Sequence, residues 1–112
     1  MDKQEQAKFL IEALPHIRKY FNKVLVVKYG GNAMIDDELK SSVMRDLSVL
    51  HSLGIKIVLV HGGGPEISET VKKMGLETKW INGLRYTDKE TAEVVRMVLA
   101  GKVNKSLVGL LE

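Results

Sequence analysis

Two runs of consecutive apolar residues interrupt an otherwise mixed pattern of polar and apolar positions. They occupy residues 24–27 and 55–60, and only Lys56 breaks the second run. Such runs are typical of strands that are buried on both faces, as in parallel sheets. Residues 37–53 between them carry apolar side chains at helical spacing, and Gly54 is a common kind of helix stop. The pattern predicts a βαβ unit whose right-handed crossover makes the two strands parallel.

A further helix is predicted ahead of the first strand. Residues 3–21 present apolar side chains on one face, and Pro15 is expected to kink or divide the helix. The stripe fits a helix that packs on its own domain, and it fits equally an arm that docks on another subunit. We therefore treat residues 1–22 as an N-terminal helical extension and leave both interpretations open.

Three more elements are predicted after the second strand. Pro65 suits the first turn of a helix that should run to about residue 74. Asn82-Gly83 is typical of a two-residue hairpin turn between short strands. Thr87-Asp88-Lys89-Glu90 has the spacing of a capping box, with the threonine as the cap, and predicts the start of a long helix.

The small number of predicted strands indicates that this chain is part of a longer protein. The last residues lie inside an apolar pattern, and two parallel strands are fewer than a complete doubly wound sheet usually has. We expect residues 23–112 to be the N-terminal lobe of a longer α/β protein, truncated in this chain.

Composition narrows the class of protein. The 112 residues carry a net charge of +3, contain no cysteine, and include no apolar run near the roughly 20 residues needed to cross a bilayer. The polar start lacks the apolar centre of a secretory signal. Basic residues are dispersed and aromatic residues are few, which argues against nucleic acid as a partner. We expect a cytoplasmic protein with an acidic small-molecule ligand and with no membrane or nucleic-acid partner.

A glycine-rich loop follows each apolar run. The first reads Lys28-Tyr29-Gly30-Gly31-Asn32 and the second reads His61-Gly62-Gly63-Gly64-Pro65. Because parallel strands end at the same edge of a sheet, both loops should lie where ligands of open α/β sheets bind. Exposed backbone N–H groups form an anion cradle, and Lys28 adds a positive charge. The loops predict a site for phosphate or carboxylate chemistry.

Several familiar signatures are missing from the sequence. It contains no P-loop of the usual kind, and Ile67 stands where the dinucleotide fingerprint needs its third glycine. The three histidines show no metal-ligand spacing, so no metal site is assigned. His61 fits a packing or turn residue that could orient a loop. Asn32 and Glu66 fit loop and helix-start positions, and Trp80 a packing position.

Three motifs in a fixed order remain, and they carry a resemblance. They are residues 28–34, 61–65 and 82–87, and the likeness continues into residues 100–105. Together they resemble the amino acid kinase family, which includes aspartate, glutamate, uridylate and carbamate kinases. The resemblance covers nearly all of residues 24–111. It implies a three-layer αβα fold with an open, mainly parallel sheet of the carbamate kinase-like type, of which this chain would be the N-terminal lobe only.

The resemblance also implies an activity. Residues 82–85 favour the branch of the family that transfers the γ-phosphoryl group of ATP to the side-chain carboxylate of N-acetyl-L-glutamate, a step of arginine biosynthesis. ATP and Mg²⁺ would be held mostly by a C-terminal lobe, so this segment alone is expected to be inactive. Two alternatives stay open: another amino acid kinase, such as a carbamate or glutamate 5-kinase, and a non-catalytic regulatory or binding module.

Site residues follow from the same resemblance. Lys28 matches the lysine that stabilises the transferring phosphoryl group, and Gly30-Gly31 match the phosphate loop. Gly63-Gly64 match the amides that hold the substrate, and Arg85 matches the arginine that grips a substrate carboxylate. Taken alone, the lysine fits a solvated strand end, the glycines fit tight turns, and the arginine fits a hairpin surface.

The resemblance further implies a homo-oligomer. The helix of residues 88–111 is expected to contribute to a dimer contact. Arginine-inhibited members carry a helix like residues 1–22 and use it to link dimers into hexamers. We therefore expect a possible hexamer and feedback inhibition by arginine.

Overall fold

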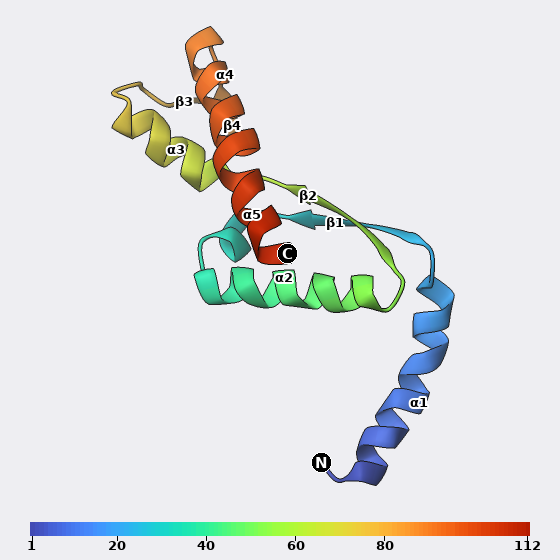
Figure 1. Cartoon of the computed structure of the whole chain (residues 1–112). Coiled ribbons are helices and arrows are strands. Elements are labelled where there is room, and N and C mark those ends of the chain that lie inside the picture. Colours follow the sequence, from blue (N-terminus) through green and yellow to red (C-terminus); the bar gives the residue numbers. More distant parts are fainter.

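A parallel βαβ unit forms the centre of the molecule, as the apolar pattern predicts. β1 (Val24–Tyr29) pairs with β2 (Lys56–His61) in a register that joins Val24 to Lys56 and Tyr29 to His61. The helix α2 (Asp37–Ser52) connects the two strands and lies along one side of them in Figure 1. Gly54, at a φ of 87°, ends the turn after α2. The predicted strand order and direction are confirmed.

The computed structural model describes residues 1–112, with the exception of the Asn32 side chain. The interpretation of that side chain as a loop residue therefore lies outside the described part. The remaining elements are α1 (Lys3–Tyr20), the 3₁₀ turn η1 (Gly31–Met34), α3 (Gly64–Lys73), β3 (Lys79–Ile81), β4 (Leu84–Tyr86), α4 (Lys89–Arg96), the π-helical segment η2 (Met97–Val103) and α5 (Asn104–Leu111). No helix among the described residues is both long enough and apolar enough to span a membrane.

Only one face of the two-stranded sheet is covered by helices. Along each strand, buried or half-buried residues alternate with exposed ones, and the former face the core and the helices α2 and α5. Val24 is 63% exposed and Val60 is 51% exposed. The prediction of burial on both faces is therefore wrong for this chain. The strands are apolar on both sides, but these 112 residues supply a helical layer for one side only.

The core lies between α2, α3 and the long helix built from α4, η2 and α5. Met44, Val71 and Val94 are its most deeply buried large side chains. The long helix is predicted by the sequence, but its cap differs. Asp88, one residue after the predicted Thr87, is the N-cap, and its carboxylate accepts the N–H of Thr91 at 2.8 Å. Aspartate satisfies the free N–H groups and also interacts favourably with the helix dipole.

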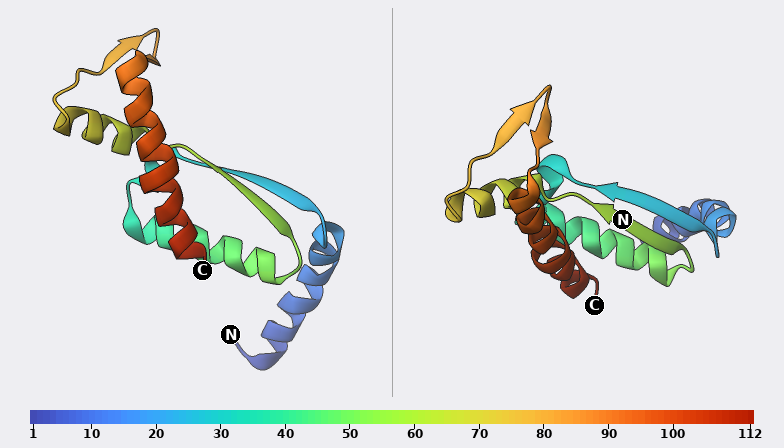
Figure 2. Two further views of the ribbon diagram at one scale, coloured as in Figure 1. Left: turned by 45° about the horizontal axis from the view of Figure 1, so that its top comes forward. Right: turned by 90° about the horizontal axis from the view of Figure 1, so that it is seen from above.

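The hairpin forms as expected. β3 and β4 are antiparallel, and Asn82 and Gly83 have φ angles of 50° and 76°. Positive φ at both central residues is what a type I′ hairpin turn requires. The hairpin lies with α3 and α4 at the opposite end of the molecule from α1 (Figure 2).

α1 projects from the body of the molecule (Figure 1). Asp2 and Glu5 form a capping box at its start, and no residue of the helix is buried. Phe9 is 63% exposed and Leu10 is 67% exposed. Pro15 lies inside α1, which runs as one helix from Lys3 to Tyr20, so the expected division of this helix does not occur. Within this chain the apolar stripe is not packed against the domain.

Candidate functional site

Both glycine-rich loops leave the same edge of the sheet. The register places Lys28 opposite Val60, and the N–H of Gly62 donates to the carbonyl of Tyr29 at 3.0 Å. A Cβ built on Gly30 would lie 4.0 Å from the backbone nitrogen of Gly62. The two loops are therefore neighbours, and the predicted placement of Lys28 and the triple glycine at one edge is confirmed.

Tyr29 holds the first glycine loop through a hydrogen bond of its side chain. Its ring is buried, and its hydroxyl donates to the carbonyl of Ala33 at 2.7 Å. This bond links the end of β1 to η1. Burial raises the pKa of Tyr29. Two nearby charges have smaller effects on this pKa: Lys40 lowers it and Glu66 raises it. The phenol therefore stays protonated and remains a donor. Gly31 has a φ of 63°, which a residue with a side chain rarely adopts.

Lys28 lies on the uncovered face of the sheet. Its side chain is exposed, like those of Val24 and Val26, which lie on the same face of β1. This position leaves the ammonium group available to a ligand at the edge of the sheet. It is equally the position of a solvated lysine at a strand end.

The second loop is packed against the π-helical segment. Gly63 is buried, and a Cβ there would lie 2.7 Å from Cδ2 of Leu99 and 3.2 Å from Cγ2 of Val103. A Cβ on Gly64 would meet no atom within 4 Å. Packing therefore explains the glycine at position 63. At position 64 the space around the built Cβ is open, which leaves room for close approach of a ligand.

Arg85 reaches from the hairpin to the start of α3. Its Nη2 donates to Oγ of Ser68 at 2.8 Å and to the carbonyl of Gly64 at 3.3 Å. Its guanidinium carbon lies 4.7 Å from the ring centre of Trp80, close enough for a cation–π contact. The structure thus brings Arg85 to the Gly63-Gly64 loop, from which it is separated by a helix and a strand in sequence.

Sequence reasoning missed the residues that hold Arg85. Ser68 lies one helical turn after Gly64, and Nη1 of Arg85 lies 3.5 Å from Oγ1 of Thr78. Nothing in the local pattern marks these two hydroxyl groups. Trp80 could have been found, because the Asn82-Gly83 turn sets a register in which Trp80 pairs with Arg85.

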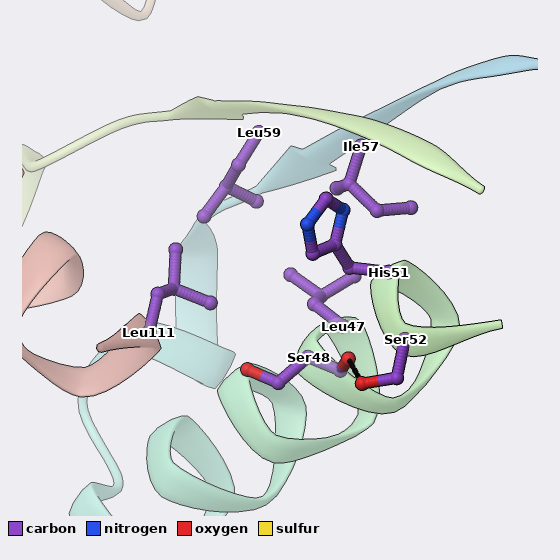
Figure 3. Close-up of a pocket in the computed structure, with 7 residues that line it drawn as sticks. All are labelled: Leu47, Ser48, His51, Ser52, Ile57, Leu59 and Leu111. Carbon is purple, nitrogen blue, oxygen red and sulfur yellow. Dashed lines mark hydrogen bonds between the residues drawn. The ribbon is translucent and has the colours of Figure 1, made fainter. Parts of the chain in front are cut away.

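Of two further cavities, the larger lies away from this edge, and the smaller lies beside it, because Glu66 at the start of α3 and Val103, which packs against Gly63, line it. The larger, about 420 Å³, is formed by α2, β2 and the end of α5, and none of the predicted site residues lines it (Figure 3). The smaller, about 90 Å³, is lined by Lys40, Glu66, Lys102 and four further residues. Oε2 of Glu66 is buried without a hydrogen-bond partner among the described residues. Those residues also contain no cluster of three metal-ligating side chains.

A parallel βαβ unit with glycine loops at its carboxyl edge defines an α/β protein of the kind whose ligands bind at that edge. The profile described as "Amino acid kinase family" matches residues 23–112. The chain belongs to the amino acid kinase family.

Curated relatives extend over almost the whole chain. The acetylglutamate kinase of Clostridioides difficile is 62% identical over 93% of this chain and 36% of its own length. That of Carboxydothermus hydrogenoformans is 56% identical over 96% of this chain and 37% of its own length. The chain therefore spans little more than a third of the relatives that it matches.

Solved structures agree on the fold. The N-acetylglutamate synthase of Neisseria gonorrhoeae, in complex with coenzyme A and N-acetyl-glutamate, is similar with a TM-score of 0.74 and 26% identity, over 94% of this chain and 24% of that chain. The protein smu.665 of Streptococcus mutans is similar with a TM-score of 0.64 and 29% identity, over 79% of this chain and 35% of that chain.

Proposed function

We propose that the complete protein containing this chain is an acetylglutamate kinase, which transfers the γ-phosphoryl group of ATP to the side-chain carboxylate of N-acetyl-L-glutamate in arginine biosynthesis. The observation that carries the proposal is the identity of 53–62% to eight curated proteins of that name, over at least 93% of this chain. We assign this reaction to the cytoplasm.

The second loop and Arg85 hold the carboxylate substrate in this proposal. A guanidinium group binds a carboxylate through two parallel hydrogen bonds, and the N–H groups at Gly63-Gly64 add donors at the start of α3. Arg85 is already oriented by Ser68 and Trp80, so less side-chain freedom is lost when the substrate binds. These contacts support a role for Gly63, Gly64 and Arg85 in substrate binding.

The first loop and Lys28 act on the group that is transferred. Phosphoryl transfer depends on positioning and on neutralisation of charge rather than on covalent chemistry. The backbone of Gly30-Gly31 approaches the phosphoryl group, and the ammonium group of Lys28 stabilises the negative charge that develops on it. ATP arrives with Mg²⁺ and is held mostly by a lobe outside these residues, so the segment by itself is inactive.

One experiment distinguishes the proposed function from two others, another amino acid kinase and a regulatory module. The complete protein is assayed for ATP consumption with N-acetylglutamate, glutamate, aspartate and carbamate in parallel. The proposal requires N-acetylglutamate to be the preferred acceptor by at least about a hundredfold in kcat/KM. Preference for carbamate or glutamate would assign another amino acid kinase. Binding of N-acetylglutamate without phosphoryl transfer would assign a regulatory module.

We also propose a homo-oligomer. A dimer forms through the N-terminal lobe, with α4 to α5 at the contact, and the exposed stripe of α1 links dimers into a hexamer that responds to arginine. The support is the family resemblance together with the exposed apolar side chains of α1.

A further inference from the structure

His61 uses both of its ring nitrogens. Nδ1 lies 2.9 Å from the carbonyl oxygen of Gly62, and Nε2 lies 3.2 Å from Nδ2 of Asn104. A carbonyl oxygen only accepts and an amide NH₂ group only donates, so this pattern assigns the tautomer with its hydrogen on Nδ1. Nζ of Lys105 donates to Oδ1 of Asn104 at 3.1 Å, which agrees with this orientation of the amide.

Asn104 comes from a distant and unusual part of the chain. It is 43 residues from His61 and is the first residue of α5, directly after η2. π-helical turns are rare and occur frequently at functional sites. Leu99 and Val103 of η2 also pack directly against Gly63. One segment therefore contacts the glycine loop by packing and, through the Asn104–His61 pair, by hydrogen bonding.

The bond to Gly62 fixes the direction of a donor in the loop. The carbonyl of Gly62 and the N–H of Gly63 belong to one planar peptide group. Holding the carbonyl therefore also holds the N–H, which points the opposite way. Glycine has the greatest backbone freedom of any residue, so a loop of three glycines needs external contacts to keep one orientation.

We propose that Asn104 is a positioning residue, which acts through His61 to orient the Gly62–Gly63 peptide of the substrate loop. Asn104 holds the imidazole in one tautomer, and His61 then holds the peptide. The inference rests on the proposed function only where it takes the Gly63 N–H as a substrate donor. The arrangement of the three residues is independent of it.

The tautomer is tested by nitrogen NMR of the complete protein with ¹⁵N-labelled histidine, in which His61→Gln identifies the signal. The expected result is a protonated Nδ1 and an unprotonated Nε2. In Asn104→Asp the new carboxylate only accepts, so Nε2 should become protonated. Ser106→Ala, an exposed neighbour on α5, should leave the signal unchanged. Protonation of Nε2 in the unaltered protein would overturn the proposal.

The positioning role is tested by kinetics of single and double variants. Asn104→Ala should raise KM for N-acetylglutamate about fivefold, the worth of one hydrogen bond, with little change in kcat. In a His61→Ala background, or in His61→Gln if the former does not fold, Asn104→Ala should add nothing. Additive losses would show that Asn104 does not act through His61. Absence of kinase activity in the unaltered protein would overturn the proposed function, whereas the NMR result would still decide the arrangement.

Discussion

Arg85 and Lys28 are cationic side chains near the same glycine loops, but their surroundings differ. Arg85 is half-buried, stacks on Trp80 and is hydrogen-bonded to Ser68. Lys28 is exposed on the uncovered face of the sheet. A side chain that is oriented before binding suits the substrate carboxylate, whereas Lys28 lies beside the first loop, where we assign the charge that develops during transfer.

This difference predicts a division of kinetic effects in the complete protein. Arg85→Ala should raise KM for N-acetylglutamate about tenfold to a hundredfold, the range for a charge-assisted hydrogen bond. Lys28→Ala should mainly lower kcat, by roughly a hundredfold or more. Steady-state kinetics with both substrates varied measure the two constants. Arg85→Lys, which keeps the charge without the fork, is the matched control and should recover only part of the affinity. Equal changes in both constants for both variants would contradict the division.

The glycine loop gives a second contrast between residues. Gly63→Ala should destabilise the protein by about 1–3 kcal/mol, because Leu99 and Val103 must move. In Gly64→Ala the added methyl group lies in open space, so the stability of the protein should be unchanged while KM for N-acetylglutamate rises. Gly109→Ala on α5, also in open space but outside both glycine loops, is the control for KM. Chemical denaturation and kinetics separate the two effects. An unchanged KM in Gly64→Ala would remove that residue from the substrate site.

At the level of helices and strands, much of the fold could be predicted because its signals are local. Apolar runs, helical periodicity and glycine stops define the βαβ unit, and Asn82-Gly83 defines the hairpin. The same signals do not distinguish a π-helix from an α-helix, since η2 keeps the apolar spacing of its neighbours. The contacts of Arg85 with Ser68 and of His61 with Asn104 join distant elements. Local patterns carry no information on such pairs.

The cap of α4 predicts a dependence of stability on pH. The hydrogen bond from the backbone N–H of Thr91 holds the pKa of Asp88 below its usual value. A lowered folded-state pKa stabilises the protein above the unfolded pKa, near 4, and this stabilisation is lost as the pH falls through the folded value. Asp88→Ala should therefore lower Tm at neutral pH, with a difference that shrinks in acid. Asp88→Asn, which caps without a charge, should lack this dependence. Thermal melts of the three proteins across pH measure it, and a constant difference would contradict it.

The whole molecule is elongated, with extents of 59 × 29 × 28 Å, and two of its exposed apolar surfaces belong to the sheet and to α1. One is the outer face of the sheet, with Val24 and Val60, and the other is the stripe of α1, with Phe9 and Leu10. Sequence reasoning expected the first to be buried, because the composition of a strand reflects every layer that covers it in the complete protein. The second belongs to α1, which projects from the body of the molecule (Figure 1) and has no buried residue within this chain.

The exposed apolar stripe of α1 predicts that the oligomer becomes smaller when this helix is removed. Removal of residues 1–22 from the complete protein should reduce the proposed hexamer to dimers, and the proposed inhibition by arginine should weaken with it. Paired substitutions Phe9→Glu and Leu10→Glu should act alike, because charge on the stripe opposes burial at an interface. Lys8→Glu next to them changes charge without removing apolar surface and serves as the control. Light scattering coupled to size exclusion measures the mass, and an unchanged mass in the truncated protein would mean that α1 does not link dimers.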